Sequence, residues 1–157
     1  MSNKKTEQLN KLLIDIEKLV PFKDKTNSKI STSNIGWQLD HSLKVINNVC
    51  TILEKKHSKK YKKDFNAWRA ILFPLGYIPR GKGKAPKFVN EQNPISAQSL
   101  HSQIDDAKAS INRTELLDKN AYFIHHVFGN LSKQNTLRFL EIHTKHHLKI
   151  VNDILKT

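Results

Sequence analysis

The stretch that decides the fold runs from residue 140 to residue 155 and reads LEIHTKHHLKIVNDIL. Its apolar residues and two of its histidines recur every three or four positions, which is the spacing of one face of an α-helix. The members of this stripe are Leu140, His143, His147, Ile150 and Ile154. Imidazoles therefore stand at two positions where a helix packed into a core ordinarily carries leucine.

The histidines of this stripe have two interpretations. They are either half-buried residues with separate hydrogen-bond partners or ligands of one metal ion. Residues four apart on a helix have Cβ atoms about 6 Å apart, near enough for His143 and His147 to chelate an ion. His146 lies about 100° around the helix from His147, so spacing alone also allows a pair of His143 with His146. Either pair needs a further ligand from another helix, as metal sites in helical bundles commonly do.

Helical spacing recurs along most of the chain. It predicts long helices over 4–20, 33–57, 95–117 and from Ser132 nearly to the end. A shorter helix is expected around Trp68, ending where Pro74 interrupts the pattern. Alternating β patterns are absent, and the stretch FIHHVFGNLS before the last helix is expected to be a loop. We therefore predict an all-α fold, a four-helix bundle with a short extra helix and a Gly/Pro-rich loop, in a single domain over 1–157.

The second predicted helix offers a possible third ligand. His41 stands in GWQLDHSLKV, where periodicity alone places it at the boundary of the apolar face. Composition and spacing therefore leave open whether His41 joins His143 and His147.

The Gly/Pro-rich loop GYIPRGKGKAPKFVNEQNP covers residues 76–94. Loops of this length inside a compact domain are commonly functional, which makes the segment a candidate lid. Its cations Arg80, Lys82 and Lys84 are suited to an anionic substrate, although a solvated loop explains them equally well.

The formal net charge of +13 raises the question of a polyanionic partner. Among the 27 basic residues four are arginines, whereas bidentate recognition of guanine or phosphate favours arginine. The densest run, EKKHSKKYKKDF, has a single aromatic residue among its lysines, Tyr61, and so lacks a series of interleaved rings on which successive bases stack. We therefore expect a solvated lysine-rich surface rather than a nucleic acid or membrane partner. The alternative function is a non-catalytic basic helical module that binds nucleic acid or another polyanion.

The chain carries no sign of export. Its first residues lack an apolar signal region, and no stretch approaches the roughly 20 apolar residues of a membrane span. Cys50 is the single cysteine, which excludes an intrachain disulfide, and it is expected to be a small buried apolar residue. These features predict a cytoplasmic protein.

Three motifs together resemble the DinB-like superfamily of metal-binding four-helix bundles. They are WQLDHSLKV at 37–45, HHVFGNLS at 125–132 and HTKHHLKIV at 143–151. In particular the chain is similar to a branch of short proteins that pair a His-Pro-x-Phe-Gly-x-Leu motif with a closing His-x-x-His-His-Leu. The segment GYIPRGKGKAP also looks like the middle of that branch, so the resemblance covers nearly the whole chain. It implies that His41, His143 and His147 bind a divalent metal.

The resemblance also suggests roles for two neighbouring histidines. His125 matches a family residue near the site, which implies that it supports a ligand or donates a proton. His126 stands where the family motif has proline, and we expect it to be an ordinary loop residue. Relatives in the superfamily include thiol-dependent transferases and isomerases, so a low-molecular-weight thiol is an implied cofactor.

Three neutral imidazoles leave at least one coordination position open, which is typical of catalytic sites. Zinc, nickel, manganese and iron all fit such ligands. The sequence thus suggests a metal-dependent enzyme, a thiol-dependent transferase or a hydrolase, acting on a small-molecule substrate. Its ligands must be deprotonated, so binding is expected to fail as the pH falls through about 6.5. Apolar faces on long helices are also compatible with a homodimer.

Overall fold

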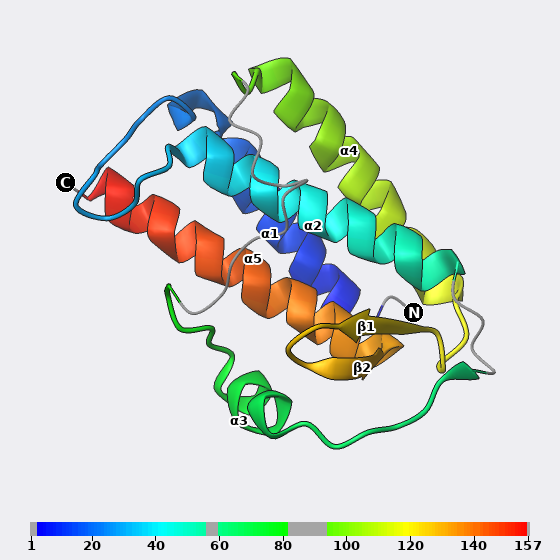
Figure 1. Ribbon diagram of the computed structural model, residues 1–157. Coiled ribbons are helices and arrows are strands. Elements are labelled where there is room, and N and C mark those ends of the chain that lie inside the picture. Colours follow the sequence, from blue (N-terminus) through cyan, green and yellow to red (C-terminus); the bar gives the residue numbers. More distant parts are fainter. Residues whose placement is uncertain (1–2, 56–59, 82–93, 157) are drawn as a thin grey trace.

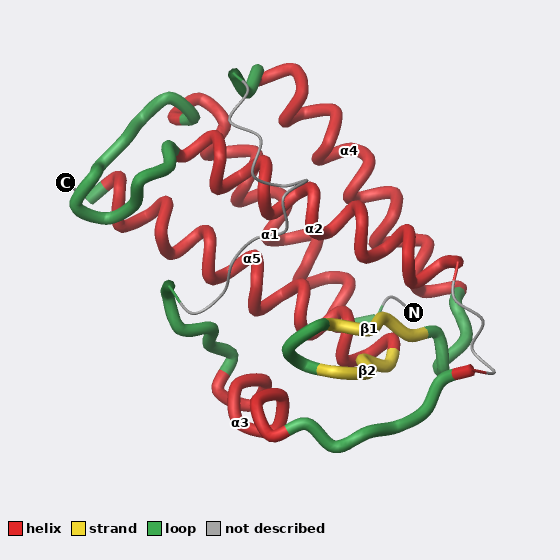
Figure 2. Tube along the Cα trace, in the orientation of Figure 1, coloured by secondary structure: helices red, strands yellow, loops and turns green. Residues whose placement is uncertain are grey.

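The computed structural model describes residues 3–55, 60–81 and 94–156 (Figure 1). Within these ranges the chain is mostly helical, with one small sheet (Figure 2). The long helices are α1 (Lys4–Leu19), α2 (Ile35–Lys55), α4 (Ala97–Arg113) and α5 (Lys133–Leu155). These bounds confirm the four long helices that periodicity predicts, to within a few residues at most ends. The predicted end of the second helix, at residues 56–57, lies outside the described ranges.

The four long helices pack around one apolar core. α1 and α2 each contact both α4 and α5, so α1 lies diagonally across from α2 (Figure 1). Each helix contributes fully buried leucines or isoleucines, among them Leu13, Leu43, Leu100 and Leu140. Because α2 has α4 on one side and α5 on the other, its buried arc is wider than a single apolar stripe.

Side-chain caps explain where the helices begin. Asn3, Ser96 and Ser132 each accept a hydrogen bond from a backbone N–H in the first turn of α1, α4 and α5. Asn34 does the same for α2, since its Oδ1 accepts from the amide of Trp37 at 2.8 Å. Each cap satisfies one of the amides that the start of a helix leaves unpaired.

The expectation of an all-α fold is confirmed only in that the described residues are mostly helical, and the expectation that FIHHVFGNLS is a loop is wrong. This stretch forms an antiparallel hairpin of β1 (Tyr122–His125) and β2 (Gly129–Ser132), in which His125 pairs with Gly129 (Figure 2). Gly129 adopts a φ of +70°, the left-handed conformation that a three-residue hairpin loop requires at its end. The strands have four residues each, too few for a two-residue period to stand out in the sequence.

The hairpin is tied to the segment that precedes α3 (Ala67–Leu75). The Arg69 guanidinium donates to the Asp64 carboxylate and to the backbone carbonyls of Phe128 and Asn130. The Asp64 carboxylate in turn accepts from the amide of Asn130 at 2.9 Å. A side chain at Gly129 would overlap this carboxylate, so the glycine is required by space as well as by φ.

The short helix α3 confirms the prediction around Trp68, and Pro74 lies inside its last turn. It ends at Gly76, which has a φ of +63° and closes the helix in the left-handed conformation. Most of the candidate lid, including Lys82 and Lys84, lies outside the described residues. None of the described helices is both long enough and apolar enough to cross a membrane.

Candidate metal centre

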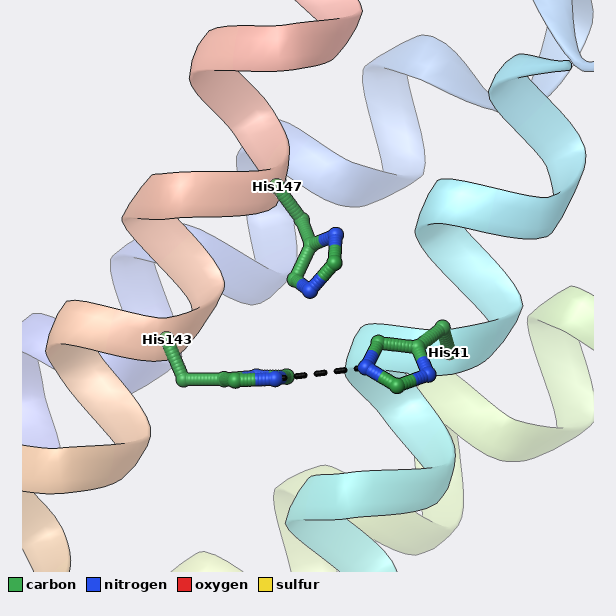
Figure 3. Close-up of side chains that lie close together, drawn as sticks. All are labelled: His41, His143 and His147. Carbon is green, nitrogen blue, oxygen red and sulfur yellow. Dashed lines mark hydrogen bonds between the residues drawn. The ribbon is translucent and has the colours of Figure 1, made fainter. Parts of the chain in front are cut away.

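Three histidines meet between α2 and α5. His41 comes from α2, and His143 and His147 come from successive turns of α5 (Figure 3). One nitrogen of each ring lies within 4.8 Å of the corresponding nitrogen of the other two. The structure therefore brings together the three residues that the resemblance indicates, and they lie close enough to hold one metal ion.

His41 is buried, not at a boundary. Its side chain is 4% exposed, and that of His147 is 8% exposed, while His143 is partly exposed. Periodicity underestimated the burial of His41 because α2 packs against two helices and not one. Although His143 as a residue is partly exposed, its Nδ1 is buried and its Nε2 faces His41.

The rings of His41 and His143 face each other through their Nε2 atoms, which lie 3.3 Å apart (Figure 3). Two nitrogens bound to one tetrahedral zinc at 2.0–2.1 Å lie about 3.3 Å apart, so the observed separation matches shared coordination. The same separation also allows one ring to donate a hydrogen bond to the other.

The second nitrogen of each of these two rings has no partner among the described residues, and this does not distinguish a bound ion from a hydrogen bond between the rings. The Nδ1 atoms of His41 and His143 are buried, and neither has a hydrogen-bond partner among the described residues. Unpaired buried polar atoms are costly. With an ion between the rings, each Nε2 lone pair would be satisfied, and each Nδ1 would carry a proton for which no acceptor lies among the described residues. The donor type and the spacing thus both fit a metal.

Gln38 supports the third histidine. Its Oε1 lies 2.6 Å from Nδ1 of His147, and because an amide oxygen only accepts, this nitrogen carries the proton. The lone pair of His147 is then on Nε2, the nitrogen that points toward the other two rings (Figure 3). Gln38 is itself buried and oriented, since its amide nitrogen donates to Ser31 Oγ at 3.2 Å. Such outer contacts fix the orientation of metal-binding histidines.

Trp37 covers the cluster on the α2 side. Its ring stacks on that of His41 with centroids 4.9 Å apart and planes 11° apart, and its edge meets His147 at 6.2 Å. Neither Trp37 nor Gln38 was identified from the sequence as a site residue. Their positions four and three residues before His41, on the same side of a helix, are the signal that was available.

Burial keeps all three histidines neutral. Desolvation lowers the pKa of His41 to about 4 against a weaker opposing effect of Asp40, and it lowers the pKa of His143 and His147 well below the ordinary value. The neighbouring histidines lower these pKa values further. Neutral imidazole is the form that binds metal. Release of a metal is therefore expected at a lower pH than the value near 6.5 that the sequence suggested.

His146 has a different partner. Its Nδ1 lies 3.0 Å from the carbonyl oxygen of Ile78, to which it donates, in the segment that follows α3. This contact resolves the alternative that spacing left open, because the structure brings His147 and not His146 to His41. Two residues further along, Arg80 pairs with Asp153 of α5 at 2.6 Å, so its charge is already partnered.

His125 lies one ring away from the cluster. Its imidazole packs on Phe139 at 4.6 Å between centroids, and Phe139 packs on His143 at 5.6 Å. Its Nδ1 accepts from the amides of Val127 and Phe128, which places the ring proton on Nε2. Burial lowers the pKa of His125 to about 4. His126 is exposed at the hairpin loop.

Comparison of the chain with protein-family models, with curated proteins and with solved structures finds no match.

Proposed function

We propose that this chain is a metal-dependent enzyme with a DinB-like four-helix bundle, in which His41, His143 and His147 hold one divalent metal ion. The observation that carries the proposal is the convergence of three neutral imidazoles between α2 and α5, with their ligand nitrogens within 4.8 Å of one another. The 3.3 Å separation of the Nε2 atoms of His41 and His143 supports it, because two nitrogens bound to one zinc ion lie about this far apart.

The residues around the metal would hold, orient and shield it. Gln38 fixes the ring of His147, and Trp37 closes the α2 side. When bound, a divalent metal supplies a Lewis acid that activates water or a thiol. His125, a neutral ring whose proton is on Nε2, is proposed to donate a hydrogen bond beside the site.

The reaction we propose is thiol-dependent transfer or hydrolysis of a small electrophilic molecule. Three protein ligands leave a position for the reacting group, which supports both reactions. Resemblance to the DinB-like superfamily supports the thiol, and zinc, nickel, manganese and iron are all compatible with imidazole ligands. A bundle with an open metal site serves many reactions, so the substrate must come from experiment.

The first experiment measures metal content. The protein is purified without a histidine tag, loaded with zinc, nickel or manganese at neutral pH, desalted and analysed for bound metal. We expect about one metal per chain in the wild type and none in a His143→Ala, His147→Ala double variant, because one remaining imidazole cannot retain an ion.

A matched control removes two histidines outside the cluster. The His101→Ala, His126→Ala double variant changes exposed positions and should keep the full metal content. Loss of metal in both variants, or absence of metal in the wild type, would refute the site. Thiol transfer and hydrolysis are then screened with the loaded wild type. A protein that binds RNA or DNA with steep salt dependence and holds no metal would instead be the basic binding module.

A further inference from the structure

Helix α3 has an outward face made entirely of apolar side chains. It stands outside the four long helices, next to the hairpin (Figure 1). Trp68 is 59% exposed, Ile71 is 55% exposed and Leu75 is 69% exposed, and Phe65 just before the helix is 85% exposed. The other exposed residues of the helix are Ala67, Ala70 and Pro74. A patch of this kind on a protein surface indicates an interaction site.

The same helix is rigidly held from behind. Leu72 and Phe73 enter the core, and Phe73 packs on Phe128 of the hairpin with centroids 5.2 Å apart. The one charged residue of α3, Arg69, turns inward to Asp64 and the hairpin carbonyls. The orientation of the apolar face is therefore fixed by contacts that leave its outer side uncovered by the described residues.

The chain around α3 is strongly basic. Over residues 55–80 the sequence has eight lysines and arginines and a single acidic residue, Asp64, which Arg69 neutralises. Lys60, Lys62 and Lys63, which lead into the helix, are all exposed. The apolar face is thus preceded in the chain by an exposed basic segment, residues 60–63, which we call its basic margin, whereas Arg80 is paired with Asp153.

We propose that α3 is the element by which this protein binds an anionic membrane surface. A short helix with Trp and aliphatic side chains on one side and lysines at its margin lies in the interface, with its apolar face below the headgroups. Tyr77, 49% exposed just after the helix, suits the same boundary. An anionic bilayer supplies both an apolar phase and the opposite charge, so it matches the apolar face and its basic margin together.

A second copy of the chain fits this face less well. Two copies joined through α3 would bring their lysines at 60–63 together in chains that each carry a formal charge of +13, so charge repulsion opposes the contact. The proposal revises the sequence-based expectation of no membrane partner. It is independent of the proposed metal centre, because none of the three metal-binding histidines lies on α3.

The test uses vesicles of phosphatidylcholine with phosphatidylserine in equal amounts, beside vesicles of phosphatidylcholine alone. Cosedimentation and Trp fluorescence follow the binding of the full chain. We expect binding to the mixed vesicles only, a blue shift as Trp68 leaves water, and loss of most binding between about 0.1 M and about 1 M salt, where the Debye length falls from about 10 Å to about 3 Å.

Matched variants distinguish binding through the apolar face of α3 from binding through the net positive charge of the whole protein. Ile71→Asp should weaken vesicle binding at least about tenfold, and Leu75→Asp provides a second variant of the same kind. Leu116→Asp makes the same change at a site that is 89% exposed and remote from α3, and it should bind like the wild type. The double variant Lys62→Glu, Lys63→Glu should also weaken vesicle binding. The double variant Lys108→Glu, Lys119→Glu makes the same change in net charge elsewhere and should weaken vesicle binding less.

The outcomes are distinct. Equal binding by Ile71→Asp, Leu75→Asp and the wild type would overturn the proposal, as would absence of binding to the mixed vesicles. If the wild type fails to bind and sediments as a dimer that Ile71→Asp converts to a monomer, the face is covered by a second copy. The His143→Ala, His147→Ala variant should bind vesicles normally, so failure of the metal site and failure of the membrane site are separable.

Discussion

The helix pairs α1/α4 and α2/α5 have the same helical periodicity but very different interiors. The buried residues of α1 and α4 are almost all aliphatic, with Thr6 and Ser110 as the exceptions. Those of α2 and α5 include eight polar or charged side chains: Gln38, Asp40, His41, Ser42, Thr136, Glu141, Thr144 and His147. An aliphatic contact is complete once water is excluded, whereas buried imidazoles need partners. Among the described residues, the Nδ1 atoms of His41 and His143 lack such partners, and these are the rings of the proposed metal centre.

The largest effect we expect is a loss of folding stability at acid pH, caused by protonation of the three histidines between α2 and α5. Each of its histidines has a lower pKa in the folded state than the value near 6.5 of the unfolded chain, and for His41 the folded pKa is about 4. The unfolded state therefore binds more protons between these values, and stability falls as the pH falls through this window. We expect a loss on the order of 5 kcal/mol between pH 7 and pH 4 in metal-free protein, measured by urea unfolding in the presence of chelator.

The control for the acid effect removes the titrating groups. A His41→Leu, His143→Leu double variant should show a much shallower dependence of unfolding free energy on pH. Identical slopes in the wild type and this variant would mean that the cluster does not titrate as its burial requires.

The next largest change in the free energy of unfolding is expected from a substitution in the core between helices α1 and α4. Leu13 of α1 is 1% exposed, so Leu13→Ala removes buried apolar volume and leaves a cavity. We expect a loss of about 2–5 kcal/mol in the free energy of unfolding. The loss should be the same with and without metal, and it should shift the whole pH profile without changing its slope. A metal-dependent loss would show that the two helix pairs are coupled.

Removing the hydrogen bond from His147 to Gln38 should have a smaller effect, which is seen in the affinity for metal. Gln38→Leu deletes the acceptor of the His147 Nδ1 proton, and we expect the affinity for zinc to fall about 10–100-fold. Gln38→Glu keeps an acceptor and should retain the affinity. The exposed Gln98→Leu serves as the matched control. Competition with a chromogenic chelator measures the affinity, and equal values for Gln38→Leu and the control would contradict the role of Gln38.

We expect the smallest change in the free energy of unfolding when the two facing histidines, His41 and His143, are replaced by leucine. In metal-free protein at pH 7, the His41→Leu, His143→Leu variant should be within about 1 kcal/mol of the wild type or more stable, because it removes two unpaired buried nitrogens. It should bind no metal. A loss comparable to that of Leu13→Ala would show that these rings have partners that stabilise the fold without an ion.

The sequence was sufficient to predict the long helices and the two histidines that α5 contributes to the candidate metal centre. The four-residue spacing of His143 and His147 is local, so periodicity placed both on one face of α5. His41 required the resemblance, because its burial depends on α2 lying between two helices. The choice of His147 over His146 depended on the carbonyl of Ile78, a contact across 68 positions that spacing cannot reveal.

The β-hairpin, in contrast to the long helices, could not be predicted from the local sequence. Its strands are too short for an alternating pattern, and Gly129 was the only strong local cue. What stabilises it is remote in sequence, since Asp64 and Arg69 bind its backbone from more than fifty residues away. The outward face of α3 was visible in the sequence as an apolar run, but periodicity alone could not show that its outer side would stay uncovered.

The separation of the proposed ligands along the chain would set the timing of metal capture. His41 and His143 are 102 positions apart, and α5 provides two of the three imidazoles. A ribosome must therefore complete α5 before any three-ligand site exists, and the growing chain before that point offers only isolated histidines of low affinity. Loading of the proposed metal centre would accordingly be a late event in biogenesis, and the identity of the ion would depend on what is available to the finished protein.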